Sequence, residues 1–70
     1  SYVVSLLDDL DIAAGKVAEE GMEVAEAARE SDERLVAELA DLWFHSYVLL
    51  AARGLDPDDV EAELARRAGD

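Results

Sequence analysis

The stretch RLVAELADLWFHSYVLLAAR, residues 34–53, is the longest mainly apolar segment of this 70-residue chain. Its large apolar side chains cover most of the circumference of a helix instead of forming one stripe. A helix that is apolar on all sides must be buried on all sides, and one small chain offers too little other surface to bury it. The segment therefore predicts a central helix that is buried against a second copy of the chain.

The residues around this segment also favour helix. Almost all are good helix formers, and no stretch alternates as a strand does. Ser31 or Asp32 is suited to cap the start of the central helix, Gly54 to end it, and Asp56-Pro57 to begin another helix. We therefore expect one all-α domain over residues 1–70, with a short helical segment and three helices at about 2–9, 11–30, 32–53 and 57–67.

The apolar positions of the second segment recur at spacings of three and four, which predicts one buried stripe. The stripe consists of Leu10, Ala14, Val17, Gly21, Val24 and Ala28. Lys16, Glu20 and Glu23 fall on an adjacent polar stripe. In the last helix, Val60 and Leu64 are expected to face inward.

Charge and composition restrict the partners. Eighteen acidic residues against six basic ones give a formal net charge of -12, which disfavours nucleic acid as a partner. A small phosphorylated ligand remains compatible with this charge if metal ions bridge it to carboxylates. The chain has no cysteine, as is usual in a reducing cytoplasm. A metal ion and oligomerisation are therefore the expected supports for so small a domain.

No segment is expected to enter a membrane. The longest uncharged stretch, Leu42–Ala52, is shorter than a membrane span and includes His45, Ser46 and Tyr47. The first residues lack the basic region and apolar core of a signal peptide. We therefore expect a cytoplasmic protein.

Two acidic clusters, Glu19-Glu20-Gly21-Met22-Glu23 and Glu38-Leu39-Ala40-Asp41, lie on consecutive predicted helices. The short connection at residues 31–32 makes these helices antiparallel neighbours, so the clusters can face each other across one groove. Carboxylates that interrupt an apolar helix are rarely buried unless they are paired or bind a cation. Hard oxygen ligands on two rigid helices predict a site for a divalent cation, most simply Mg²⁺.

Within this site, Glu20, Glu23, Glu38 and Asp41 are the candidate metal ligands. A carboxylate that is not used as a ligand can serve as general base toward water, and either Glu19 or Glu20 fits that role. The alternative for the first cluster is a solvated helix face. For the second cluster it is an ion pair with Arg34 or Arg53, or a polar edge of the bundle.

Lys16 and His45 flank the acidic clusters. Lys16 lies one turn before Glu20, where it can form an i,i+4 ion pair or contact a phosphate. His45 lies one turn after Asp41, and it can support the substrate or be a hydrogen-bonded core residue. Trp43 fits a core or interface position better than a base-stacking role.

These motifs, taken together, resemble those of the all-α nucleoside triphosphate pyrophosphohydrolases of the MazG kind, and more narrowly the phosphoribosyl-ATP pyrophosphohydrolases. The shared pattern is Glu-Glu-x-x-Glu at 19–23, followed after fourteen residues by Glu-x-x-Asp at 38–41. Ser1-Tyr2 with Leu6-Leu7, the segment Lys16-Val17-Ala18-Glu19-Glu20, and Ala40-Asp41-Leu42-Trp43-Phe44-His45 match the narrower family. The C-terminal block from Gly54 through Asp59-Val60-x-x-Glu63-Leu64 extends the resemblance along nearly the whole chain.

This resemblance implies a MazG-like helical bundle completed by dimerisation. It also implies Mg²⁺-dependent hydrolysis of phosphoribosyl-ATP to phosphoribosyl-AMP and pyrophosphate, the second step of histidine biosynthesis. Carried over by position, the five carboxylates of the two clusters would be metal ligands or the water-activating base, and Lys16 would be catalytic or support the substrate together with His45.

The chain also departs from the family pattern. Gly15-Lys16 stands where the family usually has two lysines, and Phe44 replaces a common Tyr. The family usually has a leading helix before its Ser-Tyr segment, and these 70 residues show no counterpart to it. Two alternatives remain open: a house-cleaning pyrophosphohydrolase acting on ordinary nucleoside triphosphates, and a non-catalytic acidic helical dimer.

Overall fold

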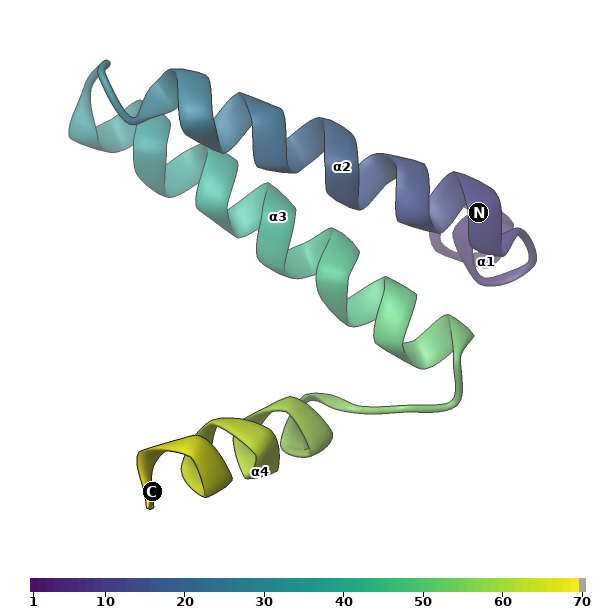
Figure 1. The fold of residues 1–70 in the computed structure, drawn as a ribbon. Helices are drawn as coiled ribbons and strands as arrows, with labels where there is room; N and C mark the ends of the chain where they lie inside the picture. The colour runs from purple at the N-terminus through teal and green to yellow at the C-terminus, as the bar shows by residue number, and fades with distance from the viewer. Residues whose placement is uncertain (70) are drawn as a thin grey trace.

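Helices α2 (Leu10–Ala27) and α3 (Asp32–Ala52) form an antiparallel hairpin in the computed structural model, which describes residues 1–69 (Figure 1). Helix α1 (Tyr2–Leu7) precedes the hairpin, and α4 (Pro57–Ala68) follows it. No strand is present in residues 1–69, so the prediction of an all-α fold is confirmed. Helix α2 ends at Ala27, earlier than predicted, because the backbone amides of Arg29 and Glu30 bond three residues back and close a tight turn.

The helix boundaries follow from local capping. Ser31 caps α3 by accepting a hydrogen bond from the backbone amide of Arg34 at 3.2 Å. Gly54 adopts a φ of 73° after the end of α3, a conformation that costs glycine little. Asp56 begins α4 with a capping box, in which its side chain and that of Asp59 each accept a backbone hydrogen bond. Each of these helix ends lies where the sequence predicted it.

The face of α2 that packs against α3 differs from the predicted stripe. Ala13 and Ala27 are buried at its two ends, whereas Leu10, Ala14 and Ala28 of the predicted stripe are exposed. Val17 and Val24 belong to both stripes and are half-buried. Relative to the predicted stripe, the buried face of α2 is therefore rotated toward the polar side of the helix. This rotation places Glu20 at the hairpin interface, whereas the predicted stripe left Glu20 next to the interface.

Helix α1 closes one end of the hairpin and contacts both longer helices (Figure 1). Leu6 of α1 is 1% exposed and packs with Ala13 and Val48. The phenol of Tyr2 lies 2.7 Å from Nε2 of His45, and Nδ1 of His45 lies 2.8 Å from the backbone oxygen of Asp41. Because a carbonyl oxygen only accepts, Nδ1 is the donor, and Nε2 of a neutral ring accepts from Tyr2. This chain of bonds connects α1 to α3.

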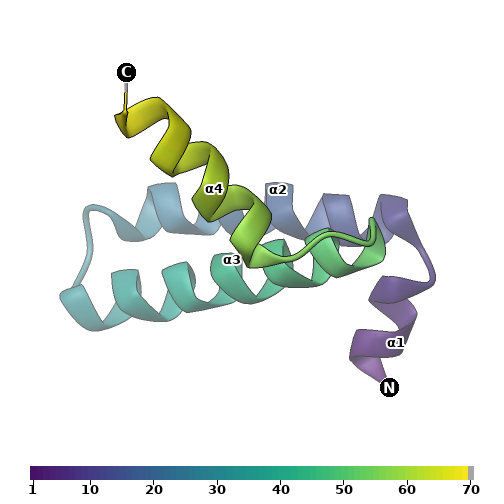
Figure 2. The same ribbon diagram turned by 90° about the horizontal axis from the view of Figure 1, so that it is seen from below.

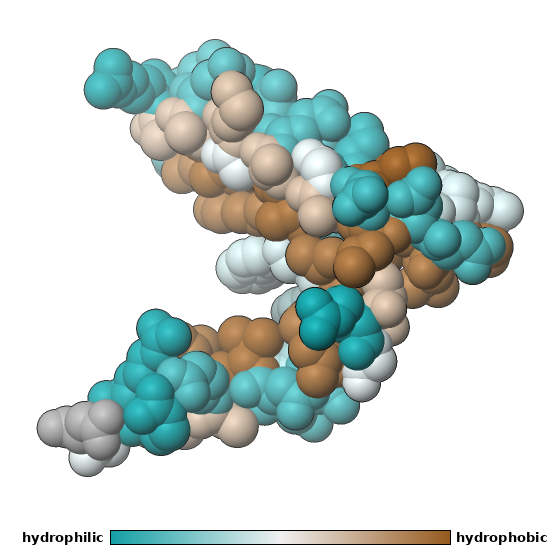
Figure 3. Space-filling view, turned by 45° about the vertical axis from the view of Figure 1, so that its right-hand side comes forward, coloured by the Kyte–Doolittle hydropathy of each residue, from teal (hydrophilic) through white to brown (hydrophobic). Residues whose placement is uncertain are grey.

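Helix α4 extends away from the hairpin at an angle and makes few contacts with it (Figures 1 and 2). None of its residues is buried, and Val60 and Leu64, which were expected to face inward, are 45% and 58% exposed in the single chain. The space between α4 and the hairpin is an open notch lined by apolar side chains (Figure 3). Its residues include Leu10, Leu50, Trp43, Tyr47, Val60 and Leu64.

Helix α3 is long and apolar enough to cross a membrane by length and composition alone, which corrects the prediction that no segment reaches that threshold. A single helix of this kind is weak support for membrane insertion, because the core helix of a soluble protein passes the same test. Within one chain, only His45 and Val48 of α3 are buried. The burial on all sides predicted for this helix is therefore not achieved by a single chain.

The Glu63 carboxylate should titrate well below the usual range. Hydrogen bonds from Arg66 and Arg67 lower the pKa of Glu63 from 4.5 to about 2. Because the folded pKa is depressed, this contribution to α4 is present above about pH 4.5 and is lost as the pH falls toward 2. A ¹³C NMR titration of the side-chain carboxyl should show a midpoint near 2, and a midpoint between 4 and 5 would contradict the ion pairs.

The bond between Tyr2 and His45 should contribute measurably to stability. In a double-mutant cycle of Tyr2→Phe and His45→Leu, we expect a coupling of about 1 kcal/mol in the free energy of unfolding, since each change removes one partner of the same bond. Urea unfolding at pH 8 and fixed protein concentration measures it. Additive effects of the two substitutions would show that the bond does not stabilise the fold.

Candidate metal centre

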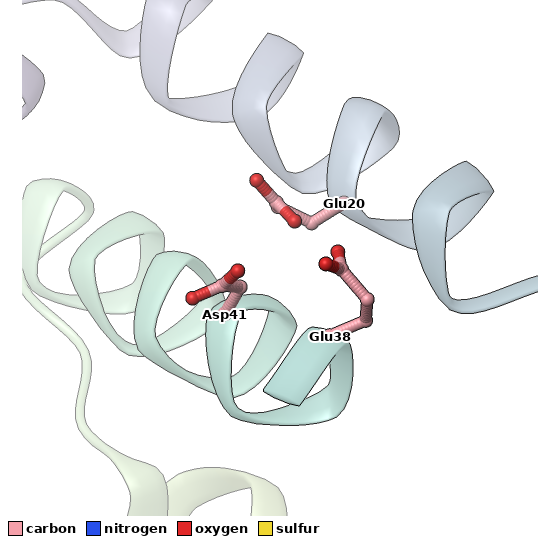
Figure 4. A group of neighbouring side chains, drawn as sticks. All are labelled: Glu20, Glu38 and Asp41. Atoms are coloured by element: carbon pink, nitrogen blue, oxygen red, sulfur yellow. The ribbon is translucent and has the colours of Figure 1, made fainter. Parts of the chain in front are cut away.

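Three of the predicted site residues meet across the α2–α3 hairpin. Glu20 projects from α2, and Glu38 and Asp41 project from successive turns of α3, with their carboxylates pointing toward one another (Figure 4). One oxygen of each carboxylate lies within 4.8 Å of the others. The antiparallel hairpin brings the two acidic clusters together, as the sequence predicted.

The geometry of this group fits a hard cation. Two oxygens bound to one Mg²⁺ ion at about 2.0–2.1 Å are at most roughly 4.2 Å apart, so small side-chain rotations suffice for the three carboxylates to share an ion. The ligand set consists only of carboxylate oxygens, which suits Mg²⁺, Ca²⁺ or Mn²⁺ better than softer metals. Glu20, Glu38 and Asp41 can therefore hold a metal ion.

Glu38 is the most constrained of the three. Its side chain is only 14% exposed. Loss of solvent raises the pKa of its carboxyl, Arg34 opposes that rise, and the charges of Glu20, Glu23 and Asp41 add to it. A carboxylate in this environment is stabilised by a cation, which would remove the repulsion among its acidic neighbours.

The other two acids of the first cluster lie outside this group of three. Glu23 faces the same groove but is 3.5 Å from Nη2 of Arg34. Glu19 is 59% exposed and forms an ion pair with Lys16 at 3.4 Å. The predicted i,i+4 partner of Lys16 was Glu20. In the structure Lys16 pairs with Glu19 instead, at a spacing of three residues. The hydrogen bond to Glu19 raises the pKa of the Lys16 ammonium.

Arg34 pairs with Glu38 at 3.4 Å, which was the predicted alternative for that carboxylate. Arg34 also pairs with Glu30 and Glu23, and neither contact was predicted from the sequence. The spacing of four residues could have identified Glu30, whereas the contact with Glu23 depends on the hairpin.

His45 lies in the core, one helical turn after Asp41 of the carboxylate group. It is 8% exposed, and both ring nitrogens have partners. Its Nδ1 bond to the backbone oxygen of Asp41 fixes the turn of α3 that carries the Asp41 carboxylate. The ring therefore occupies a hydrogen-bonded core position, which was one of the two roles predicted for His45. No local pattern marks Tyr2 as its partner, because the two residues are far apart in sequence.

Comparison with known proteins places this arrangement in a family. The family model described as phosphoribosyl-ATP pyrophosphohydrolase matches residues 1–68. A phosphoribosyl-ATP pyrophosphatase of Methylococcus capsulatus is 49% identical over 71 residues, which cover 99% of this chain and 68% of that protein. The corresponding protein of Chromobacterium violaceum is 51% identical, with 99% and 66% covered.

A third relative with the same name, from Verminephrobacter eiseniae, is 48% identical over 75 residues, covering 99% of this chain and 56% of its own length. The chain thus spans between 56% and 68% of the length of these relatives. The match runs through both acidic clusters. The chain therefore belongs to the phosphoribosyl-ATP pyrophosphohydrolase family.

Proposed function

We propose that this chain hydrolyses phosphoribosyl-ATP to phosphoribosyl-AMP and pyrophosphate with Mg²⁺, the second step of histidine biosynthesis, in the cytoplasm. The observation that carries the proposal is the meeting of Glu20, Glu38 and Asp41 within 4.8 Å of one another. The family match adds the substrate, since the relatives are named for it. An excess of negative charge would repel a triphosphate, so the site requires a cation between the protein and its substrate.

Glu20, Glu38 and Asp41 are assigned as metal ligands, with Glu23 completing the set from the adjacent turn of α2. When bound, Mg²⁺ supplies positive charge that polarises the phosphoryl oxygens. The helices hold their carboxylates on a rigid frame, so little reorganisation is needed during the reaction. Tyr2 and His45 support this frame from behind, through the backbone of Asp41.

The water-activating base is assigned to Glu19. Of the two candidates, Glu20 lies in the group of three carboxylates, whereas Glu19 lies outside it and is therefore assigned as the proton acceptor. Its carboxylate would take one proton from water while the water oxygen bonds to phosphorus, and the bond between the α- and β-phosphates breaks to release pyrophosphate. Lys16, 3.4 Å away, would hold the Glu19 carboxylate in place and remain near the phosphates.

The proposal predicts Mg²⁺-dependent release of pyrophosphate from phosphoribosyl-ATP, measured beside dATP and dCTP as competing substrates. Glu38→Gln and Asp41→Asn should each lower kcat/KM by about 100-fold or more, because each replaces a charged ligand by a neutral amide. Glu26→Gln, an exposed change of the same charge on α2, is the matched control and should retain activity.

Two outcomes would contradict this assignment. Release from dATP and dCTP but not from phosphoribosyl-ATP would identify a house-cleaning enzyme instead. Hydrolysis that is indifferent to Mg²⁺ and to both ligand substitutions would remove the acidic centre from the reaction.

We also propose that the working unit is a homodimer formed through the apolar notch between α3 and α4. Trp43, Tyr47 and Leu64 are 61%, 53% and 58% exposed there in the single chain. Within residues 1–69 the buried side chains of one chain are too few for a stable domain of this size; they are Leu6, Ala13, Ala27, His45 and Val48. A second copy would supply the missing apolar surface and cover α3.

Sedimentation analysis should therefore give about twice the chain mass of 7.6 kDa. Trp43→Glu should shift the protein toward monomer and lower its stability, because it places a charge in the apolar notch. Met22→Glu adds the same charge on α2, outside the notch residues, and should leave the dimer intact. A monomeric wild-type protein with full activity would contradict this assembly.

A further inference from the structure

Arg34 reaches three carboxylates from the first turn of α3. Its Nε bonds to Glu30 at the end of the hairpin turn, Nη1 lies 3.4 Å from Glu38, and Nη2 lies 3.5 Å from Glu23. One guanidinium thus bridges the two helices that carry the acidic clusters. Glu38 belongs at the same time to the group that can hold a metal ion.

The three contacts are unequal. The bond to Glu30 is the shortest, whereas the contacts to Glu38 and Glu23 lie beyond the usual length of a charged hydrogen bond. The Glu30 bond is also the largest cause of the raised pKa of Arg34. Arg34 can therefore give up Glu38 and Glu23 while it stays anchored to Glu30.

A divalent cation and Arg34 are attracted to Glu38 for the same reason. Both neutralise a carboxylate that is poorly solvated and surrounded by like charges. The two cations also repel each other, so an ion bound by Glu20, Glu38 and Asp41 weakens the hold of Arg34, and Arg34 weakens the hold of the ion. This mutual effect is required by linkage.

We infer that Arg34 is an internal counter-cation of the acidic centre: it holds Glu23 and Glu38 across the hairpin before a divalent ion binds, and it competes with that ion for Glu38. This inference rests on the metal site of the proposed function and assigns a role to a residue outside the ligand set. Arg34 is a positioning residue, and its presence lowers the affinity of the centre for metal.

The test is a titration of the full chain with Mn²⁺, in which the electron paramagnetic resonance signal of free Mn²⁺ measures how much ion is bound. Arg34→Gln should bind Mn²⁺ about five-fold tighter than wild type, as expected when one nearby positive charge is removed. Arg67→Gln removes the same charge from α4, where Glu63 keeps its bond to Arg66, and should bind within about two-fold of wild type.

A purely structural role for Arg34 predicts the opposite sign, because a loosened hairpin would bind metal more weakly. Arg34→Lys keeps the charge without the planar fork and should bind with intermediate affinity. If Arg34→Gln does not fold without metal, the comparison of wild type with Arg34→Lys decides, and tighter binding by the lysine variant is required.

Equal or weaker Mn²⁺ binding by the Arg34 variants would overturn the inference while leaving the metal site in place. The absence of saturable Mn²⁺ binding in every variant, wild type included, would overturn the proposed metal site and this inference with it. The two failures are therefore distinguishable in one titration series.

Discussion

The repulsion among Glu20, Glu38 and Asp41 is a cost that the packing of this hairpin has to offset. Three carboxylates that approach within 4.8 Å, one of them on a side chain only 14% exposed, oppose the packing of α2 against α3. The apolar contacts of Leu6, Ala13 and Val48, which join α1 to both long helices, favour the packing of the hairpin. Arg34 supplies positive charge beside this group through its contact with Glu38, and an ion in the proposed metal site would supply more.

The second constraint is the shortage of core. A chain of 70 residues with one compact apolar cluster leaves most of α3 and all of α4 uncovered. The proposed metal binding and the proposed dimer would each compensate for a surface that a single chain leaves uncompensated. The apolar notch lies on one side of α3, and the notch lining includes none of the three carboxylates. The proposed assembly and the proposed metal binding would therefore use different faces of the same helix.

The helices could be predicted from the sequence because their ends are encoded locally. Ser31, Gly54 and Asp56-Pro57 each fix a boundary through bonds to their immediate neighbours. The rotation of α2 about its axis was predicted less accurately than the ends of the helices. Its face is built largely from Ala and Gly, which contribute little apolar signal, so stripes one residue apart describe the pattern almost equally well.

That ambiguity matters for the site. The predicted stripe placed Glu20 on a polar face beside the contact, and the packed stripe places it in the contact with Glu38 and Asp41. The spacing of the acids was sufficient to identify the cluster, because residues three or four apart share a helix face in either case. The bond between Tyr2 and His45 and the reach of Arg34 to Glu23 depend on tertiary packing and leave no trace in local spacing.

The small side chains at the ends of the α2 face have a further consequence. Ala13 and Ala27 are 1% and 0% exposed, and their size sets how closely α2 approaches the rest of the hairpin. The gap between facing carboxylates therefore depends in part on side chains that carry no polar atoms. In the proposed metal centre, ions of different radius would require different gaps, so a substitution at Ala13 or Ala27 would change the preference among metals without changing any carboxylate.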